Sequence, residues 1–132
     1  MNAKEIGNLG EKIAERYLRG KGFEILTNQY HASKLGEIDI IAEKNKHLHF
    51  IEVKTRTSRV FGSSSQVSWR KIWEDKPEDA ITYSKQQKIK MSINYFLMKH
   101  NIGHDDFQVD CIAVELDYKT RKAKIRYLEY II

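Results

Sequence analysis

Two carboxylates and a lysine lie in two short runs of the sequence that have the composition of partly buried strands. Asp39 lies within residues 38–42, and Glu52 and Lys54 lie within residues 48–54. Both runs are rich in the β-branched and apolar side chains that strands favour. A buried carboxylate without a partner is so costly that such groups normally meet a cation or take up a proton. These three residues are therefore the first candidates for chemistry.

The polar residues between the two runs predict how the carboxylates meet. If residues 45–46 form a tight turn, the runs pair as antiparallel strands and Asp39 falls directly opposite Glu52. The Cβ atoms of such a pair lie about 5 Å apart, where like charges repel each other. Lys54 follows Glu52 by two positions, so both share one face of their strand. Two acids and an amine that converge in this way can hold a divalent cation beside a polarised water.

A purely structural hairpin is the alternative. The charged residues would then form a ladder on the exposed face of a ribbon, and the residues between them would face the core. The ladder would consist of Glu52, Lys54 and Arg56, and the core face of Ile51, Val53 and Thr55. The pattern D-x(n)-E-x-K is weak on its own and does not decide between the two interpretations.

Asp39 together with the segment 52–54 resembles the PD-(D/E)xK nuclease signature, although Ile38 stands where the signature has proline. Further segments resemble the YraN family of small bacterial proteins, which is similar to archaeal Holliday-junction resolvases. The resemblance covers most of the chain, and a GEID segment at this distance from an ExK segment makes it specific. The matching segments are residues 10–11, 14–15, 17–18, 22–23, 28–30, 36–39, 50–56, 77–81, 85–88 and 107–110.

This resemblance implies a fold and an activity. The fold is an α/β, restriction-endonuclease-like mixed β-sheet flanked by helices, in a single domain over residues 1–132. The activity is that of a metal-dependent nuclease that hydrolyses phosphodiester bonds in DNA. The likeness to resolvases favours branched DNA or repair intermediates as substrates. The alternative is a non-catalytic nucleic-acid-binding protein on a nuclease fold, because a fold does not fix an activity.

The resemblance also implies roles for individual residues. Mg²⁺ or Mn²⁺ would be held by Asp39 and Glu52, with the backbone carbonyl of Val53 as a third ligand. Lys54 would orient the attacking water or stabilise the transition state. Glu11 would bind or support the metal from the first helix, although its position alone is typical of a solvated helix glutamate.

Composition narrows the class of protein. The length of 132 residues suits one domain, and the net charge of +5 favours a polyanionic partner such as DNA. A single cysteine, Cys111, excludes an internal disulfide and a cysteine-based zinc site. The N-terminus has no apolar signal region, and no apolar run approaches membrane-spanning length. We therefore expect a cytoplasmic protein that does not contact membranes. The sequence does not decide between a monomer and a homodimer.

The hydrophobic pattern predicts the order helix, three strands, helix, strand, strand, which gives a mixed sheet with helices packed on it. The expected helices cover residues 3–21 and 82–100. The expected strands cover residues 23–30, 38–42, 48–57, 107–116 and 123–131. The apolar stripe of the first helix is Ile6, Leu9, Ile13 and Tyr17, and that of the second is Ile89, Ile93, Phe96 and Leu97.

The sequence also predicts the surroundings of three further residues. Gly7 and Gly10 lie inside the first helix, where glycine is unfavourable, and they suggest a close approach of a strand or a phosphate backbone. Asp110 is a third carboxylate in an apolar strand, and we expect it to bond backbone amides or a histidine rather than to act in catalysis.

Basic and aromatic residues suggest where nucleic acid would bind. Residues 63–76 look like an insertion relative to the family pattern. The candidates are Arg56, Lys85 and Lys88, together with Trp69, Arg70 and Lys71 of that insertion. Aromatic rings stack on bases and basic groups contact phosphates. The spacing of Trp69 and Trp73 instead favours two rings packed on the core, and the same rings could anchor a protein partner.

Replacing Trp69, Arg70 and Lys71 together by alanine should weaken DNA binding. Each lost phosphate contact reduces the number of counterions released, so the dependence of the binding constant on salt should become flatter. Fluorescence anisotropy with labelled DNA over a range of salt concentrations measures both effects. An unchanged slope would favour the core-packing alternative.

Overall fold

The computed structural model describes residues 1–31, 36–58, 83–103, 107–117 and 119–132. In these residues the elements are α1 (Ala3–Gly20), β1 (Glu24–His31), β2 (Glu37–Lys44), β3 (His47–Ser58), α3 (Tyr83–Lys99), β4 (Phe107–Asp117) and β5 (Lys122–Leu128). The expected insertion at residues 63–76 lies outside the described part of the chain, and so do Trp69, Arg70 and Lys71.

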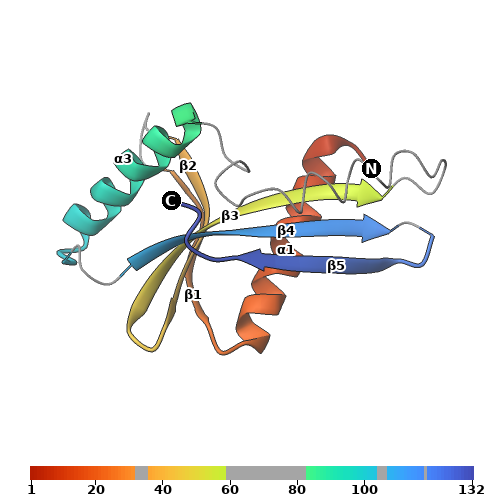
Figure 1. Cartoon of the computed structure of the whole chain (residues 1–132), viewed down its shortest axis with the longest axis horizontal. Coiled ribbons are helices and arrows are strands. Elements are labelled where there is room, and N and C mark those ends of the chain that lie inside the picture. Colours follow the sequence, from red (N-terminus) through yellow and green to blue (C-terminus); the bar gives the residue numbers. More distant parts are fainter. Residues whose placement is uncertain (32–35, 59–82, 104–106, 118) are drawn as a thin grey trace.

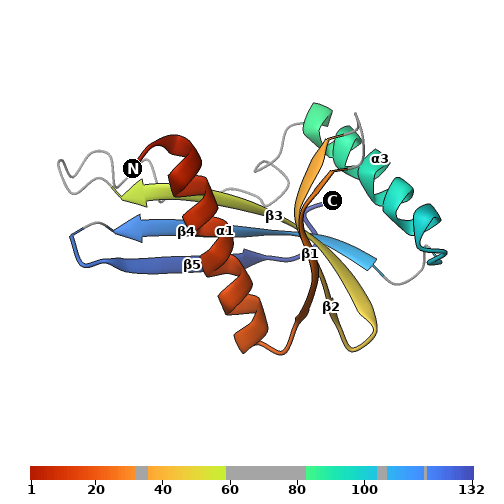
Figure 2. The same cartoon turned by 180° about the vertical axis from the view of Figure 1, so that it is seen from behind.

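The described strands form a five-stranded mixed sheet of order β1-β2-β3-β4-β5. Neighbouring strands are antiparallel except β3 and β4, which pair in parallel over residues 48–58 and 107–117. A parallel pair needs a crossover connection, and α3 lies within that connection. Helices flank the sheet, as Figures 1 and 2 show. The expected restriction-endonuclease-like fold class is confirmed.

Each face of the sheet carries its own hydrophobic core. The core beneath α3 contains the predicted stripe of that helix: Ile89, Ile93, Phe96 and Leu97 are all buried. Phe50 and the fully buried Cys111 belong to the same core. The core beneath α1 is built around Leu18, Ile40, Ile51, Ile112 and Val114. Figure 2 shows α1 running across β3, β4 and β5 on this second face.

The apolar stripe expected for α1 is partly wrong. The buried residues of the helix are Gly10, Ala14 and Leu18, whereas Leu9 is 36% exposed. The helix turns its smallest residues toward the sheet because it lies very close to β3. A Cβ atom built at Gly10 would lie 1.7 Å from Oγ1 of Thr55. The close approach of a strand that Gly10 suggested is therefore present, but Gly7 meets nothing within 4 Å.

The central hairpin follows the predicted register. Asn45 and Lys46 have φ angles of 53° and 63°, which is the signature of a type I′ turn. The turn pairs Lys44 with His47, and the ladder extends to Ile40 opposite Ile51. Continuing this register by one position places Asp39 of β2 opposite Glu52 of β3.

The last strand ends earlier than expected. It covers Lys122–Leu128 instead of residues 123–131, because the chain turns at Tyr130, whose φ is 54°. The N–H of Ile131 then donates to the carbonyl of Val109 at 2.8 Å, and the Ile131 side chain is buried in the core beneath α3. The terminal segment therefore folds back onto β4.

Asp110 has the structural role that the sequence predicts. Its carboxylate lies 2.7 Å from Nδ1 of His49 and accepts hydrogen bonds from the Tyr127 hydroxyl, the Gln108 amide and the Tyr130 N–H. Burial raises the pKa of this carboxyl, but these hydrogen bonds more than offset burial, so the pKa of Asp110 lies below its ordinary value.

Neither α1 nor α3 combines the length and the apolar character that crossing a membrane requires.

Gly10→Ala should destabilise the protein by about 1–3 kcal/mol, because the new methyl group meets Thr55 and forces the helix away from the sheet. Gly7→Ala is the matched control. It adds the same methyl group in the same helix with nothing within 4 Å, and should stabilise by about 0.5–1 kcal/mol. Urea unfolding compares the two variants. Equal effects would show that the contact between Gly10 and Thr55 does not position α1.

Candidate functional site

The candidate site lies where the side chains of β2 stop alternating regularly between the two faces of the sheet. Ile38 packs beneath α3 and Ile40 packs beneath α1, although residues two apart in a strand normally share a face. On the neighbouring strand, Tyr30 pairs with Ile38 and Asn28 with Ile40, which places Gln29 at the level of Asp39. Gln29 has a φ of 48°, in the left-handed region. Asp39 lies within this irregularity. Figure 1 shows that β1 and β2 run in a different direction from β4 and β5.

Asp39 and Glu52 meet at the end of the β2–β3 ladder. The Oδ2 atom of Asp39 accepts a hydrogen bond of 2.8 Å from the backbone N–H of Val53. Glu52 is only 3% exposed, and its Oε2 atom lies 3.1 Å from Nζ of Lys85. In the described part of the chain, the other oxygen of Glu52, Oε1, is buried without a hydrogen-bond partner.

The two carboxyl groups influence each other's ionisation. Burial and then the charge of Glu52 raise the pKa of Asp39 to about 8, against the hydrogen bond from Val53. Burial also raises the pKa of Glu52, against the opposing effects of Lys85 and of a hydrogen bond with Asp39. Both carboxyl groups therefore hold a proton more tightly than ordinary acidic side chains do. Two ionised carboxylates in this place are unstable without an added cation.

Lys54 lies two positions after Glu52 on β3 and is half-buried. Burial is the largest cause that lowers the pKa of its amine, and the charges of Lys85 and Arg56 act in the same direction. Lys54 therefore loses its proton more readily than an ordinary lysine.

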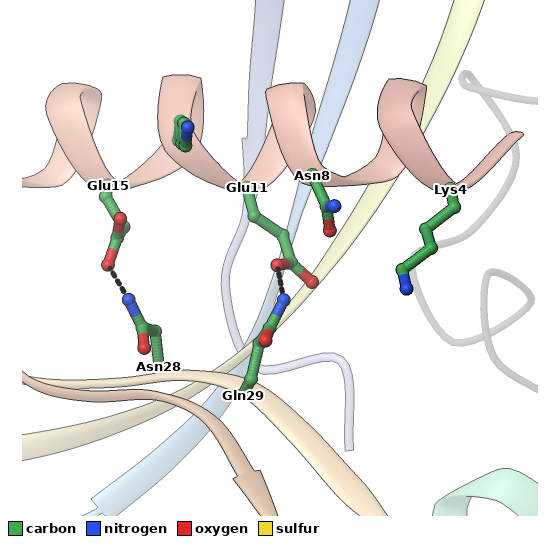
Figure 3. Close-up of a pocket in the computed structure, with 7 residues that line it drawn as sticks. Lys4, Asn8, Glu11, Glu15, Asn28 and Gln29 are labelled. Carbon is green, nitrogen blue, oxygen red and sulfur yellow. Dashed lines mark hydrogen bonds between the residues drawn. The ribbon is translucent and has the colours of Figure 1, made fainter. Parts of the chain in front are cut away.

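Two further carboxylates join Asp39 from other positions. One ligand oxygen each from Glu11, Glu37 and Asp39 lies within 4.8 Å of the other two. Glu11 reaches the group from α1, and one of its oxygens accepts a hydrogen bond of 2.9 Å from the Gln29 side chain, as Figure 3 shows. Glu37 also raises the pKa of Glu52 through its charge. The acidic group of Glu11, Glu37, Asp39 and Glu52 thus comes from α1, β2 and β3.

Glu37 received no role from the sequence alone. It lies within the matching segment 36–39 and two positions before Asp39. That spacing is the signal that could have found it, because residues two apart in a strand point to the same side.

A polar groove between α1 and β1 leads to the acidic group. Its volume is about 350 Å³, and Glu11 belongs to both the groove and the acidic group. Glu15 accepts a hydrogen bond of 2.9 Å from Asn28 across the groove. Figure 3 shows Asn8 and Lys4 pointing from α1 into the same space. The lining residues are Lys4, Asn8, Glu11, Lys12, Glu15, Asn28 and Gln29.

The acidic group has the donor chemistry that a divalent metal ion requires. Carboxylate oxygens are the ligands that Mg²⁺ and Mn²⁺ prefer, and a buried carboxylate oxygen without a partner is free to coordinate an ion. Glu52 supplies such an oxygen, and Asp39 lies beside it. The residues present therefore fit a hard divalent cation.

Comparison with known proteins places the chain in a family. A family model described as "Uncharacterised protein family UPF0102" matches residues 10–114. The chain belongs to family UPF0102. The YraN-like resemblance of the sequence is thereby confirmed.

Curated relatives match this UPF0102 chain over nearly its whole length. A UPF0102 protein of Alkaliphilus oremlandii is 37% identical over 126 residues, which is 96% of each chain. A UPF0102 protein of Campylobacter lari is 41% identical over 111 residues, which is 84% of each chain. Among solved structures, Pyrococcus furiosus SfsA in complex with Ca²⁺ matches with a TM-score of 0.36 and 15% identity. That match covers 97% of this chain and 64% of the SfsA chain.

The residues predicted to bind nucleic acid occupy different positions in the UPF0102 chain. Arg56 lies half-buried on β3, close enough for its charge to lower the pKa of Lys54. Lys85 contacts Glu52, so it belongs to the acidic group and not only to the outer surface of α3. Lys88 is exposed. The structure thus brings Lys85 together with the predicted catalytic residues, which the sequence had not indicated.

Without metal, the stability of this UPF0102 protein should fall as the pH rises from about 5 to about 8. The pKa of Asp39 is about 8 in the folded chain and 3.8 is its ordinary value, so in this window only the folded state holds the proton. Stability therefore decreases with pH, by up to about 1.4 kcal/mol per pH unit. Asp39→Asn cannot ionise but can still accept the Val53 N–H, and should lose this dependence.

Urea unfolding in EDTA at several pH values measures the effect. Relative to wild type, Asp39→Asn should gain stability steadily up to about pH 8. The exposed strand residue Glu24 provides the control, because Glu24→Gln removes a carboxylate outside the site. A difference between wild type and Asp39→Asn that does not change with pH would show that Asp39 is already ionised in the folded protein.

Proposed function

We propose that this chain is a metal-dependent nuclease that hydrolyses phosphodiester bonds in DNA. The observation that carries the proposal is the pair of neighbouring carboxyl groups, the half-buried Asp39 and the buried Glu52, which have raised pKa values and too few donors to satisfy them. Perturbed carboxyl groups that share a site with an amine are typical of catalytic centres. Membership of family UPF0102 names no activity, so the site carries the proposal.

Asp39 and Glu52 would hold Mg²⁺ or Mn²⁺. Glu11 and Glu37 lie near enough to support the same ion, directly or through water. The resemblance adds the backbone carbonyl of Val53 as a ligand, and its N–H already fixes the orientation of Asp39. Bound there, a divalent ion lowers the pKa of a coordinated water and offsets the negative charge that develops on a phosphate.

Lys54 would act on the attacking water or on the phosphate. In its charged form the amine stabilises negative charge on the phosphate oxygens during attack. In its neutral form, which the lowered pKa makes more accessible, it can take up the proton of the water. Its position on a strand that pairs with β4 holds it in place for either role.

A nucleic acid suits the surroundings of the acidic group. The adjoining groove is lined by charged and amide side chains, whereas sites for small organic molecules are mostly apolar. The net charge of +5 favours a polyanion, and Lys4 and Lys12 also line the groove. Branched DNA is the substrate that the likeness to resolvases favours.

One contact favours a second candidate, a nucleic-acid-binding protein without catalysis. The ammonium group of Lys85 already neutralises one oxygen of Glu52. If Lys85 stays there when nucleic acid binds, the acidic group is a charged anchor between α3 and the sheet. A cleavage assay separates the two functions, because only the nuclease needs a divalent ion.

The purified protein should cleave DNA in the presence of Mg²⁺ or Mn²⁺ and lose this activity in EDTA. Asp39→Ala, Glu52→Gln and Lys54→Ala should each lower the cleavage rate by about 100-fold or more, because each removes charge that acts in the transition state. Single-stranded, duplex, flapped and four-way DNA are the substrates to compare.

Glu43 lies on the same hairpin outside the acidic group, so Glu43→Gln is the control and should keep wild-type activity. Circular dichroism and DNA binding verify that the inactive variants are folded. Equal cleavage by wild type and all three site variants would identify a contaminating nuclease and contradict the proposal. Metal-independent binding without cleavage of any substrate would favour the second candidate.

A further inference from the structure

Lys85 occupies a place where the proposed metal ion would compete with it. Its Nζ atom lies 3.1 Å from Oε2 of Glu52, and its side chain is 51% exposed while that of Glu52 is 4% exposed. We propose that Lys85 is an exchangeable counter-ion, which holds Glu52 while the site is without metal and which a divalent cation displaces. This inference rests on the metal-dependent function proposed above.

The burial of Glu52 explains why a counter-ion is needed. Removing an ionised carboxylate from water costs several kcal/mol unless a cation or hydrogen bonds compensate. Lys85 supplies one such bond, but the second oxygen, Oε1, stays buried and without a partner among the described residues. A single ammonium group therefore leaves the carboxylate half satisfied, whereas a metal ion can bind both this oxygen and Asp39.

The two cations cannot share the carboxylate without repulsion. An ammonium group bonded to a ligand oxygen would lie only a few ångströms from the bound ion, in a site partly withdrawn from water. Lys85 can leave more easily than Lys54, because its half-exposed side chain comes from a helix and can extend into solvent, whereas Lys54 is attached to a paired strand.

The neighbours of Lys85 on α3 give the displaced side chain a second role. Once displaced, Lys85 lies three residues before the exposed Lys88 on a neighbouring part of the helix surface. Two lysines in this arrangement can bind phosphate, so metal and nucleic acid should strengthen each other's binding.

Isothermal titration calorimetry with Mn²⁺ and without nucleic acid tests the inference. Lys85→Met removes the competing cation and should tighten Mn²⁺ binding by about tenfold, which corresponds to about 1.4 kcal/mol. Lys85→Arg keeps a cation that can pair with Glu52 and should bind Mn²⁺ as wild type does. Lys90→Met makes the same change at an exposed position of α3 and controls for the lower net charge.

A measurement without metal gives a second readout. In EDTA, Lys85→Met should unfold at a lower temperature than wild type, because Glu52 loses its counter-ion, and Lys85→Arg should restore most of the loss. If Lys85→Met does not fold, Lys85→Gln removes the same charge with a polar side chain of similar reach.

The outcomes separate this inference from the proposed function. Tighter Mn²⁺ binding by Lys85→Met but not by Lys90→Met supports the exchange. Equal or weaker binding by Lys85→Met, while Asp39→Asn binds no Mn²⁺, overturns the exchange and leaves the metal site standing. No Mn²⁺ binding by wild type or any variant overturns both.

Discussion

The fold brings several carboxylates together against their mutual repulsion, and much of the local structure depends on this constraint. The type I′ turn at residues 45–46 sets the register that takes Asp39 to Glu52. The contact between Gly10 and Thr55 holds α1 close enough for Glu11 to reach the same place. The core beneath α3 positions Lys85 beside Glu52. Hydrophobic burial on both faces of the sheet thus holds an arrangement that electrostatics alone would oppose.

Two aspartates of this sheet, the buried Asp110 and the half-buried Asp39, have opposite electrostatic environments. Asp110 has four hydrogen-bond partners and a pKa below the ordinary value, so it remains ionised and joins three parts of the fold. Asp39 accepts a hydrogen bond from the Val53 N–H and lies near the carboxylate of Glu52. Its pKa is raised to about 8. The first environment is complete, whereas in the second the positive charge of Lys85 does not offset burial and the charge of Glu52. That deficit is what a divalent cation would fill.

The features that the sequence predicted correctly depend on local patterns. Asn45 and Lys46 determine a turn, the apolar spacing of α3 determines its buried face, and Asp110 in an apolar strand requires donors. The missed features depend on contacts between distant residues. Near Asp39 the side chains of β2 stop alternating between the faces of the sheet, opposite Gln29 of β1, whose φ is in the left-handed region. The pairing of Lys85 with Glu52 depends on how α3 lies on the sheet. Hydrophobic periodicity also missed the buried face of α1, because that face is centred on Gly10 and Ala14.

A crystal structure of the protein with Mn²⁺ tests the central claim most directly, because the anomalous signal of manganese locates the ion without reference to activity. The account predicts a peak within coordination distance of carboxylate oxygens of both Asp39 and Glu52. A peak bound elsewhere, or no peak at Mn²⁺ concentrations that fill ordinary nuclease sites, would contradict the claim that these two acids form a metal centre.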